Sequence, residues 1–419
     1  MKVTLVQPYY FNIWEAIGLG YIAAYCKKNF TGNLELDFFQ SNFDKDEDVV
    51  RCAADSDIVA FSCTSPTFRH GLCLAEKIKQ KKPGVKIVFG GNHVSALKEF
   101  IQYPVIDQIV TGEGEHAFLE ILEGNNNRIV AGKPRDFGQF PWPDRDLIRN
   151  DRTIDLCNQM TGKRIASFQA NRVCPFCCSY CSEKAVTGIY NSKTNPIRSR
   201  DVNDLLDEIE FVAARYKLDA FKFVDATFDT SAEYVISFCR EKIRRNNLLD
   251  WECMIHATLA DREIFPWLKK AGCIQINVGC ESGSQRILNA MKKGVTLEKI
   301  RSVFEWARDY GIMRRAFFII GMPDETEEDL IMTENFAALL APDVFGATIL
   351  CPYPGSDLYD HETMSHIEWD MTDEYSNDFW STKHMSNCQL KAWQKRLSDK
   401  FKNNLAWHQQ AVIDRHTDS

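Results

Sequence analysis

Four of the chain's 15 cysteines lie in one eight-residue stretch, Cys174-Pro-Phe-Cys-Cys-Ser-Tyr-Cys181. Cys174, Cys178 and Cys181 have the spacing C-x-x-x-C-x-x-C and follow an apolar run at 165–170 that predicts a strand. Thiolates are soft ligands that suit iron–sulfur clusters, copper(I) or zinc. A cubane cluster takes four cysteines, one for each iron. Three cysteines leave one iron open, and an open metal position is where substrate chemistry can occur.

A closed structural zinc site is the alternative interpretation of this stretch. Cys174, Cys177, Cys178 and Cys181 would supply four thiolates for it. Zinc ligands usually come as two separated pairs, so four ligands within eight residues are cramped. We therefore favour the cluster, and Cys177 is left without an assigned role.

The cysteine spacing, together with the aromatic Tyr180 before the last cysteine, resembles the cluster loop of radical S-adenosylmethionine (SAM) enzymes. The resemblance implies that Cys174, Cys178 and Cys181 hold a 4Fe–4S cluster whose open iron chelates SAM. It also implies that the cluster cleaves SAM reductively to a 5′-deoxyadenosyl radical. Such a reaction needs an electron donor, for which flavodoxin or ferredoxin is expected.

Length and composition set wider limits on the fold and on possible partners. A chain of 419 residues with 45% hydrophobic residues is expected to form two or three domains with sizeable cores. The net charge of −8 argues against a general nucleic-acid or anionic-membrane binder. Neither a signal peptide nor an apolar run long enough for a membrane span is found in the sequence. The many cysteines then point to a reducing cytoplasm.

Residues 1–125 alternate short apolar runs with helical segments. This alternation predicts a doubly wound, Rossmann-like parallel sheet, whose ligands bind beyond the carboxyl ends of the strands. The loops at these ends are rich in Gly, Ser and Thr, so backbone and hydroxyl groups can approach a large polar ligand. The predicted strands are 3–6, 34–38, 58–62, 85–89 and 106–110.

The order of these loops resembles the cobalamin-binding domain that precedes the barrel in one radical SAM subfamily. The resemblance implies contacts from the loops to a corrinoid, although no histidine fits the Asp-x-His-x-x-Gly pattern of domains that supply an axial ligand. A domain that keeps this fold without binding cobalamin is the alternative. His93 is interpreted as a loop histidine bonded to the backbone. The expected cobalamin contacts are Ser62, Thr64, Gly91, Gly112 and Glu113.

Residues 126–160 are expected to form a linker, because periodicity is lost and prolines flank Trp142 in a way that suggests an extended segment. Residues 161–358 then predict a partial (β/α)6 barrel of the TIM type, followed by a helical C-terminal segment at 359–419. The predicted barrel strands are 165–169, 220–224, 252–256, 274–278, 315–320 and 347–351.

Barrel chemistry is located at the carboxyl ends of the strands. The family resemblance implies that residues at these ends, with Tyr180, position SAM. Asp225 would hold the ammonium group, with helix capping as the alternative role for Asp225 and Thr227. His256 ends the third strand as a proton donor or a buried polar residue, and we favour the second. The expected SAM contacts are Tyr180, Asp225, Thr227, Glu281, Ser282 and Gly321.

The resulting hypothesis is a cobalamin-dependent methyltransferase that acts on an unactivated carbon or phosphorus centre of a small metabolite or natural-product intermediate. The alternative is a corrinoid-free radical SAM enzyme that cyclises, rearranges or oxidises its substrate or transfers another SAM fragment, such as 3-amino-3-carboxypropyl. A methylthiotransferase is disfavoured because the N-terminal cysteines are scattered and the chain is acidic. A zinc or iron–sulfur binding protein without catalysis is the remaining class.

Overall fold

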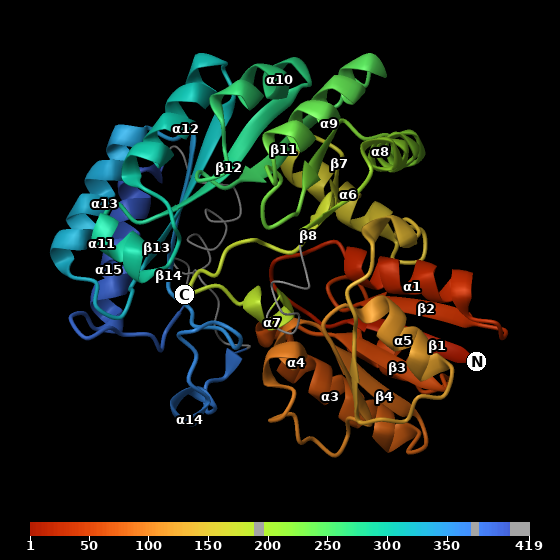
Figure 1. Ribbon diagram of the computed structural model, residues 1–419. Coiled ribbons are helices and arrows are strands. Elements are labelled where there is room, and N and C mark those ends of the chain that lie inside the picture. The colour runs from red at the N-terminus through yellow and green to blue at the C-terminus, as the bar shows by residue number, and fades with distance from the viewer. Residues whose placement is uncertain (188–196, 370–376, 403–419) are drawn as a thin grey trace. The chain divides into compact units, whose positions relative to one another are not determined.

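The computed structural model describes residues 1–187, 197–369 and 377–402 (Figure 1). The chain divides into two compact units, each of which is described here by itself. Unit 1 comprises Met1–Met160 and the segments that begin at Cys181 and Pro352. Unit 2 comprises Thr161–Tyr180, Ile197–Cys351 and the segment that begins at Asp373.

Unit 1 contains a parallel sheet with the strand order β2-β1-β3-β4-β5-β6. The order reverses at β1, as in a doubly wound fold. The predicted Rossmann-like sheet is therefore confirmed, with one strand more than the apolar runs indicated. Its strands are β1 (Lys2–Gln7), β2 (Glu35–Gln40), β3 (Ile58–Ser62), β4 (Lys86–Gly90), β5 (Gln108–Thr111) and β6 (Ile129–Ala131).

Helices cover both faces of this sheet, and each face has its own hydrophobic core. One core contains residues of α1 (Ile17–Asn29) and α5 (Gly114–Leu122). The other contains residues of α2 (Asp46–Ala53), α3 (Ser65–Lys81) and α4 (Asn92–Leu97). The three layers bury the continuous apolar strands from both sides, which is why those strands show no polar alternation.

The stretch with no clear periodicity contains a strand and an α-helix that the sequence did not predict. β6 buries only its central residue and pairs with β5. α6 (Asn150–Thr161) buries only Asn150 and Ile154 among its residues. Both elements were missed because so few of their residues face a core that no apolar repeat appears in the sequence.

Unit 2 contains an open six-stranded parallel sheet with the order β14-β13-β12-β11-β10-β7. Six strands are fewer than the eight of a closed barrel, so the predicted partial barrel is confirmed. A short antiparallel pair, β8 (Asn171–Arg172) and β9 (Arg198–Ser199), follows β7. The barrel strands are β7 (Ile165–Phe168), β10 (Ala220–Phe223), β11 (Asp250–Ile255), β12 (Cys273–Glu281), β13 (Met313–Ile320) and β14 (Val344–Ile349).

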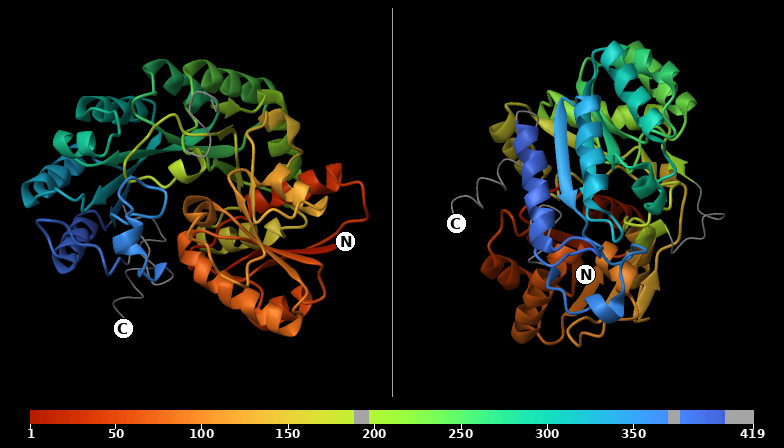
Figure 2. Two further views of the ribbon diagram at one scale, coloured as in Figure 1. Left: turned by 60° about the horizontal axis from the view of Figure 1, so that its bottom comes forward. Right: turned by 90° about the vertical axis from the view of Figure 1, so that its left-hand side faces the viewer.

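The helices of unit 2 lie on the outer face of its sheet (Figures 1 and 2). Helix α15 packs against β14 and lies within the segment expected to be helical, 359–419. The rest of the predicted tail, from residue 403, lies outside the described residues. The helices of unit 2 are α8 (Val202–Tyr216), α9 (Ala232–Arg244), α10 (Phe265–Lys270), α11 (Gln285–Ala290), α12 (Leu297–Asp309), α13 (Glu327–Leu340) and α15 (Asn387–Lys400).

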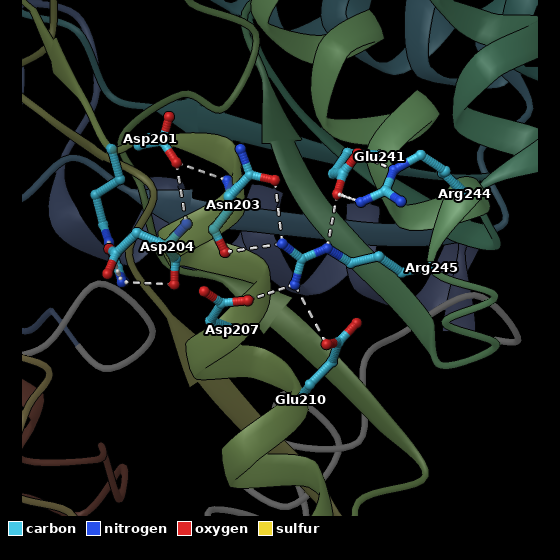
Figure 3. A network of polar contacts seen from close by, with 9 residues as sticks. Asp201, Asn203, Asp204, Asp207, Glu210, Glu241, Arg244 and Arg245 are labelled. Carbon is cyan, nitrogen blue, oxygen red and sulfur yellow. Dashed lines mark hydrogen bonds and ion pairs between the residues drawn. The ribbon is translucent and has the colours of Figure 1, made fainter.

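A surface network joins the two helices on either side of β10 in the chain (Figure 3). Arg245, at the end of α9, contacts the α8 carboxylates of Asp207 at 2.5 Å and Glu210 at 3.3 Å. Its Nε also lies 2.8 Å from Glu241 of α9. Arg245 therefore ties α9 to α8, and together the helices cover the strand that ends before Asp225.

Candidate active site at the carboxyl ends of the barrel strands

The cysteine stretch begins directly after β7 and β8, at the carboxyl end of the unit 2 sheet. Cys178 is buried, whereas Cys174 and Cys181 are half-buried and Cys177 is exposed. Val173, just before Cys174, has φ of 77°. A β-branched residue rarely adopts this conformation, and such outliers cluster at functional sites. The turn at Val173 redirects the chain from the strand into the cysteine stretch.

Asp225, after β10, is bound to the segment that leads into the cysteine stretch. Its Oδ1 accepts hydrogen bonds from the backbone N–H of Ala170 at 2.9 Å and of Asn171 at 2.5 Å. Its Oδ2 is buried and has no hydrogen-bond partner among the described residues. Burial raises the pKa of Asp225 to about 7, although the two backbone hydrogen bonds oppose this shift. Among the described residues Asp225 caps no helix, in contrast to the capping alternative, and Ser231 is the N-cap of the next helix.

Thr227 and Asp229 form a second polar group beside the end of β11. The Thr227 hydroxyl donates to Asp229 Oδ1, and the backbone N–H of His256 donates to both side chains at 3.1 and 3.0 Å. Burial raises the pKa of Asp229 to about 6, while its Oδ2 lacks a partner in the described part of the chain. Thr227 thus orients a carboxylate that sequence reasoning did not select.

His256 stacks face to face on Phe176 of the cysteine stretch, with ring centroids 3.6 Å apart. Burial, reinforced by the charge of Lys293, lowers the pKa of His256 to about 3, so the ring is neutral. The backbone N–H of Thr258 donates to Nδ1 at 3.3 Å, which places the ring proton on Nε2. This buried Nε2–H has no acceptor among the described residues. His256 is a buried polar residue, as favoured from the sequence, with one free donor.

Tyr180 of the cysteine stretch, Glu281 at the end of β12 and Lys293 form a polar cluster. Glu281 and Lys293 are buried in it, and Tyr180 is half-buried. Glu281 Oε1 accepts from the Tyr180 hydroxyl at 2.9 Å and pairs with Lys293 Nζ at 2.6 Å. Glu281 has φ of 61°, a second conformation that is uncommon for a residue other than glycine. Lys293 was not selected from the sequence, because a lysine in a Lys-Lys-Gly turn looks like a surface residue.

The two serines after Glu281 face the barrel's own helices. The Ser282 hydroxyl lies 3.2 Å from that of Thr333 in α13, and Ser282 is fully buried. The Ser284 hydroxyl donates to Asp329 of α13 at 2.6 Å. The segment Ser282-Gly283-Ser284 therefore fastens β12 to α13, which gives Ser282 a structural role in addition to the predicted SAM contact.

Gly321, after β13, has φ of 94° and both of its backbone polar groups are bonded. Its N–H donates to Glu325 Oε2, and its carbonyl accepts from the Trp380 indole at 2.6 Å. Glu325 is fully buried, and burial raises its pKa to about 7. Gly321, an expected SAM contact, thus allows close approach of the Trp380 ring.

The carboxyl ends of β10, β11 and β13 share an unusual property. Most buried polar atoms in proteins have a hydrogen-bond partner, and exceptions call for an explanation. At these ends, within the described residues, several buried side-chain atoms have none: Asp225 Oδ2, Asp229 Oδ2, His256 Nε2 and Glu325 Oε1. A ligand with both hydrogen-bond donors and acceptors would satisfy these atoms. SAM carries both kinds of group, so these residues fit SAM.

The cysteines fit a metal cluster by chemistry and spacing. Among the described residues, however, no three His, Cys, Asp or Glu side chains are gathered into a group that could hold a metal ion. Binding of a metal commonly organises its own ligands, because thiols alone do not attract one another. Burial raises the pKa of Cys178, whereas the nearby charge of Lys293 lowers it and so favours the thiolate that binds metal.

In unit 1, the expected cobalamin contacts lie in the loops at the carboxyl end of the sheet, and local contacts account for two of them. Gly91 has φ of 100°, and a Cβ there would lie 2.4 Å from the Cys63 carbonyl oxygen. Thr64 is exposed and caps α3 through a reciprocal pair with Thr67. Ser62, Gly112 and Glu113 are half-buried. Close backbone packing explains Gly91 and helix capping explains Thr64, without any ligand.

His93 lies beside these loops and is bonded to a side chain, not to the backbone as interpreted from the sequence. Its Nδ1 lies 2.9 Å from the Ser65 hydroxyl, and burial lowers its pKa to about 4. Ser65 and His93 line a cavity of about 440 Å³. The cavity also has aromatic walls, including Phe68, Phe100 and Trp369.

Comparison with known proteins identifies both units. Residues 169–337 match the radical SAM superfamily, and residues 8–122 match the B12 binding domain. The chain therefore carries a radical SAM domain and a B12-binding domain. An uncharacterised methyltransferase of Pyrococcus horikoshii is 26% identical over 75% of this chain and 71% of its own. The anaerobic magnesium-protoporphyrin IX monomethyl ester cyclase of Rubrivivax gelatinosus is 27% identical over 86% of this chain and 69% of its own.

A solved structure supports the same fold for this chain. The radical SAM methyltransferase TsrM of Kitasatospora setae, with tryptophan and a SAM analogue bound, matches with a TM-score of 0.69. The match covers 97% of this chain and 90% of TsrM at 16% identity. In the ranges that the structure describes, every helix is too short or too polar to cross a membrane.

Proposed function

We propose that this protein cleaves SAM at a 4Fe–4S cluster held by Cys174, Cys178 and Cys181 and methylates an unactivated centre of a small molecule. The observation that carries the proposal is the carboxyl group of Asp225. It is buried, is bonded to the segment leading into the cysteine stretch, and leaves one oxygen without a partner in the described structure. The named relatives include a methyltransferase, which supports methyl transfer.

The residues at the strand ends would bind and orient SAM. The Asp225 carboxylate would pair with its ammonium group, because a charge-assisted hydrogen bond is strong in a buried site. The neutral His256 would offer its Nε2–H to an acceptor on the ligand. Tyr180, Thr227, Glu281, Ser282 and Gly321 would then fix the surrounding loops, directly or through the contacts described above.

The cofactors would supply the chemistry that side chains lack. A bound cluster supplies the electron for SAM cleavage, and bound cobalamin supplies a methyl carrier. The chain's own part is to hold these groups and exclude water. Ser62, Thr64, Gly91, Gly112 and Glu113 at the carboxyl end of the unit 1 sheet are the proposed cobalamin contacts. A low-potential donor such as flavodoxin or ferredoxin is the proposed source of electrons.

A corrinoid-free reaction is the second candidate. One relative is named a cyclase, which supports a reaction other than methyl transfer. Close backbone packing and helix capping also account for Gly91 and Thr64 without a corrinoid. Cyclisation or oxidation would use the same SAM site in unit 2 and would make no use of the B12-binding domain.

One reconstitution experiment first tests the radical SAM chemistry that both candidates share. The protein is reconstituted with iron and sulfide, with and without hydroxocobalamin, and is incubated with dithionite and methyl-labelled SAM. Release of 5′-deoxyadenosine by wild type, and its loss in Cys178→Ala, supports radical SAM chemistry. Cys177→Ala is the matched control and should retain release. Equal release by wild type and Cys178→Ala would refute the proposal.

The cobalamin step has its own readout. Ultraviolet–visible spectra of the reconstituted protein after gel filtration show whether the corrinoid remains bound. Retention of a stoichiometric corrinoid, with the label passing to it, supports the methyltransferase. Release of 5′-deoxyadenosine without corrinoid retention favours the second candidate.

A further inference from the structure

The half of the cysteine stretch between Cys178 and Cys181 is docked on the turn that follows α11. The backbone N–H of Ser179 donates to the Met291 carbonyl at 2.9 Å. The Ser179 hydroxyl donates to the Ala290 carbonyl at 3.2 Å. These bonds hold the backbone next to two of the three proposed cluster ligands.

Lys293 comes two residues after this docking point and turns inward. Its ammonium group lies 2.6 Å from Glu281 Oε1 and 3.3 Å from the hydroxyl of Tyr180, which is the residue before Cys181. The side chains of Lys293 and Glu281 are only 8% and 7% exposed. A buried lysine is rare unless it is paired.

The glycine at 279 leaves room for this ion pair. An alanine Cβ there would lie 2.3 Å from Glu281 Oε1 and 2.7 Å from Lys293 Nζ. The pair thus occupies the space beside β12 that a side chain would otherwise fill. The sequence of β12, its strained Glu281 and the turn at Lys293 together place two opposite charges against the cysteine stretch.

We propose that Lys293 is a positioning residue for the cluster, whose buried ammonium, braced on Glu281 and Tyr180, raises the cluster's reduction potential. This inference rests on the proposed function, because it requires the cluster at Cys174, Cys178 and Cys181. The cluster accepts one electron from a low-potential reductant, dithionite in the experiment, and no bond forms or breaks. The added negative charge is stabilised by a nearby cation, and cluster potentials respond to such charges.

The two partners of the ion pair should shift the reduction potential in opposite directions, and this difference tests the proposal. Lys293→Met removes the positive charge and should lower the potential. Glu281→Gln removes the negative charge and should raise it. A purely structural role would not produce opposite shifts from the two partners of one pair. Lys293→Arg keeps the charge and should restore the wild-type potential.

The potential is measured in reconstituted protein by anaerobic redox titration, with the electron paramagnetic resonance signal of the reduced cluster as the readout. We expect the ratio of reduced to oxidised cluster at a fixed solution potential to fall about tenfold in Lys293→Met, which corresponds to ~59 mV for one electron. Lys292→Met is the matched control, since Lys292 is adjacent but exposed. It should leave the potential unchanged.

Iron and sulfide analysis distinguishes a failure of the proposed function from a failure of the inference about Lys293. If wild type forms no 4Fe–4S cluster, the proposed function fails. If the cluster forms and neither Lys293→Met nor Glu281→Gln shifts the potential, the inference about Lys293 is wrong. If Lys293→Met does not take up iron, Glu281→Gln decides: a higher potential supports the inference, and an unchanged or lower one overturns it.

Discussion

The affinity for SAM should depend on pH through Asp225. Its carboxyl group has a pKa of about 7 without ligand, because burial outweighs the hydrogen bonds from Ala170 and Asn171. Only the ionised form can pair with the ammonium of SAM. Between about pH 6 and about pH 7.5 the ionised fraction rises from about 0.1 to about 0.8, so Kd should fall about eightfold. An α-amino group stays largely protonated over this range.

The measurement is equilibrium binding of SAM to the oxidised, cluster-loaded protein across this range. Asp225→Asn keeps an oxygen that can accept from Ala170 and Asn171 but removes the charge. We expect its Kd to be nearly independent of pH and, near pH 7.5, about tenfold or more above that of wild type, since hydrogen bonds to charged groups contribute about 1.5–3 kcal/mol. Asp229→Asn is the matched control and should keep most of the pH dependence. The reasoning is refuted if Asp225→Asn shows the wild-type pH profile.

The same carboxyl group should affect the stability of the ligand-free protein in the opposite sense. Its pKa is about 7 in the folded protein, against the ordinary value of 3.8 that applies to the unfolded chain. The folded state therefore holds the proton more tightly. This contribution is fully present below the lower pKa and is lost as pH rises through about 7. The difference amounts to about 4 kcal/mol. In wild type the free energy of unfolding should therefore fall as pH rises through about 7, and in Asp225→Asn this fall should be smaller. Urea titration at several pH values measures the difference.

Two further predictions concern backbone positions at strand ends. Gly91→Ala should destabilise unit 1 by several kcal/mol, because its Cβ would lie 2.4 Å from the Cys63 carbonyl oxygen at φ of 100°; urea unfolding should show little change in the control Gly84→Ala, whose Cβ would meet nothing within 4 Å. Trp380→Phe removes the 2.6 Å bond to the Gly321 carbonyl and should cost about 1 kcal/mol in thermal unfolding. An unchanged midpoint would show that this indole bond contributes nothing.

Most of the fold could be predicted because the strands of both units are continuous apolar runs. β3 has the bounds expected from the sequence, and β7, β10 and β13 differ by one or two residues at an end. The elements that were missed, β6 and α6, bury few residues and so leave little periodic signal. The bulge in β12 extends that strand to Glu281, beyond the apolar run that predicted it.

Only part of the candidate site could be predicted from the sequence. Asp225 was selected from its place after a strand, and the structure adds that one of its oxygens lacks a partner in the described part of the chain. Asp229 and Glu325 looked like loop carboxylates, because nothing local shows that they are buried. Lys293 looked like a surface lysine, because its partner Glu281 is 12 residues away.

The sequence by itself determined the two α/β units, the cysteine stretch and the order of the strand ends, since these depend on residue types and on local periodicity. Tertiary structure decided which polar groups share a buried environment. The stacking of His256 on Phe176 and the raised pKa of Asp225 arise from contacts between segments far apart in the chain. The ion pair of Lys293 with Glu281 joins two residues 12 positions apart, and only folding buries it. Burial of a charge or a polar atom is a property of the packed molecule, because its cost is set by every neighbour that replaces water.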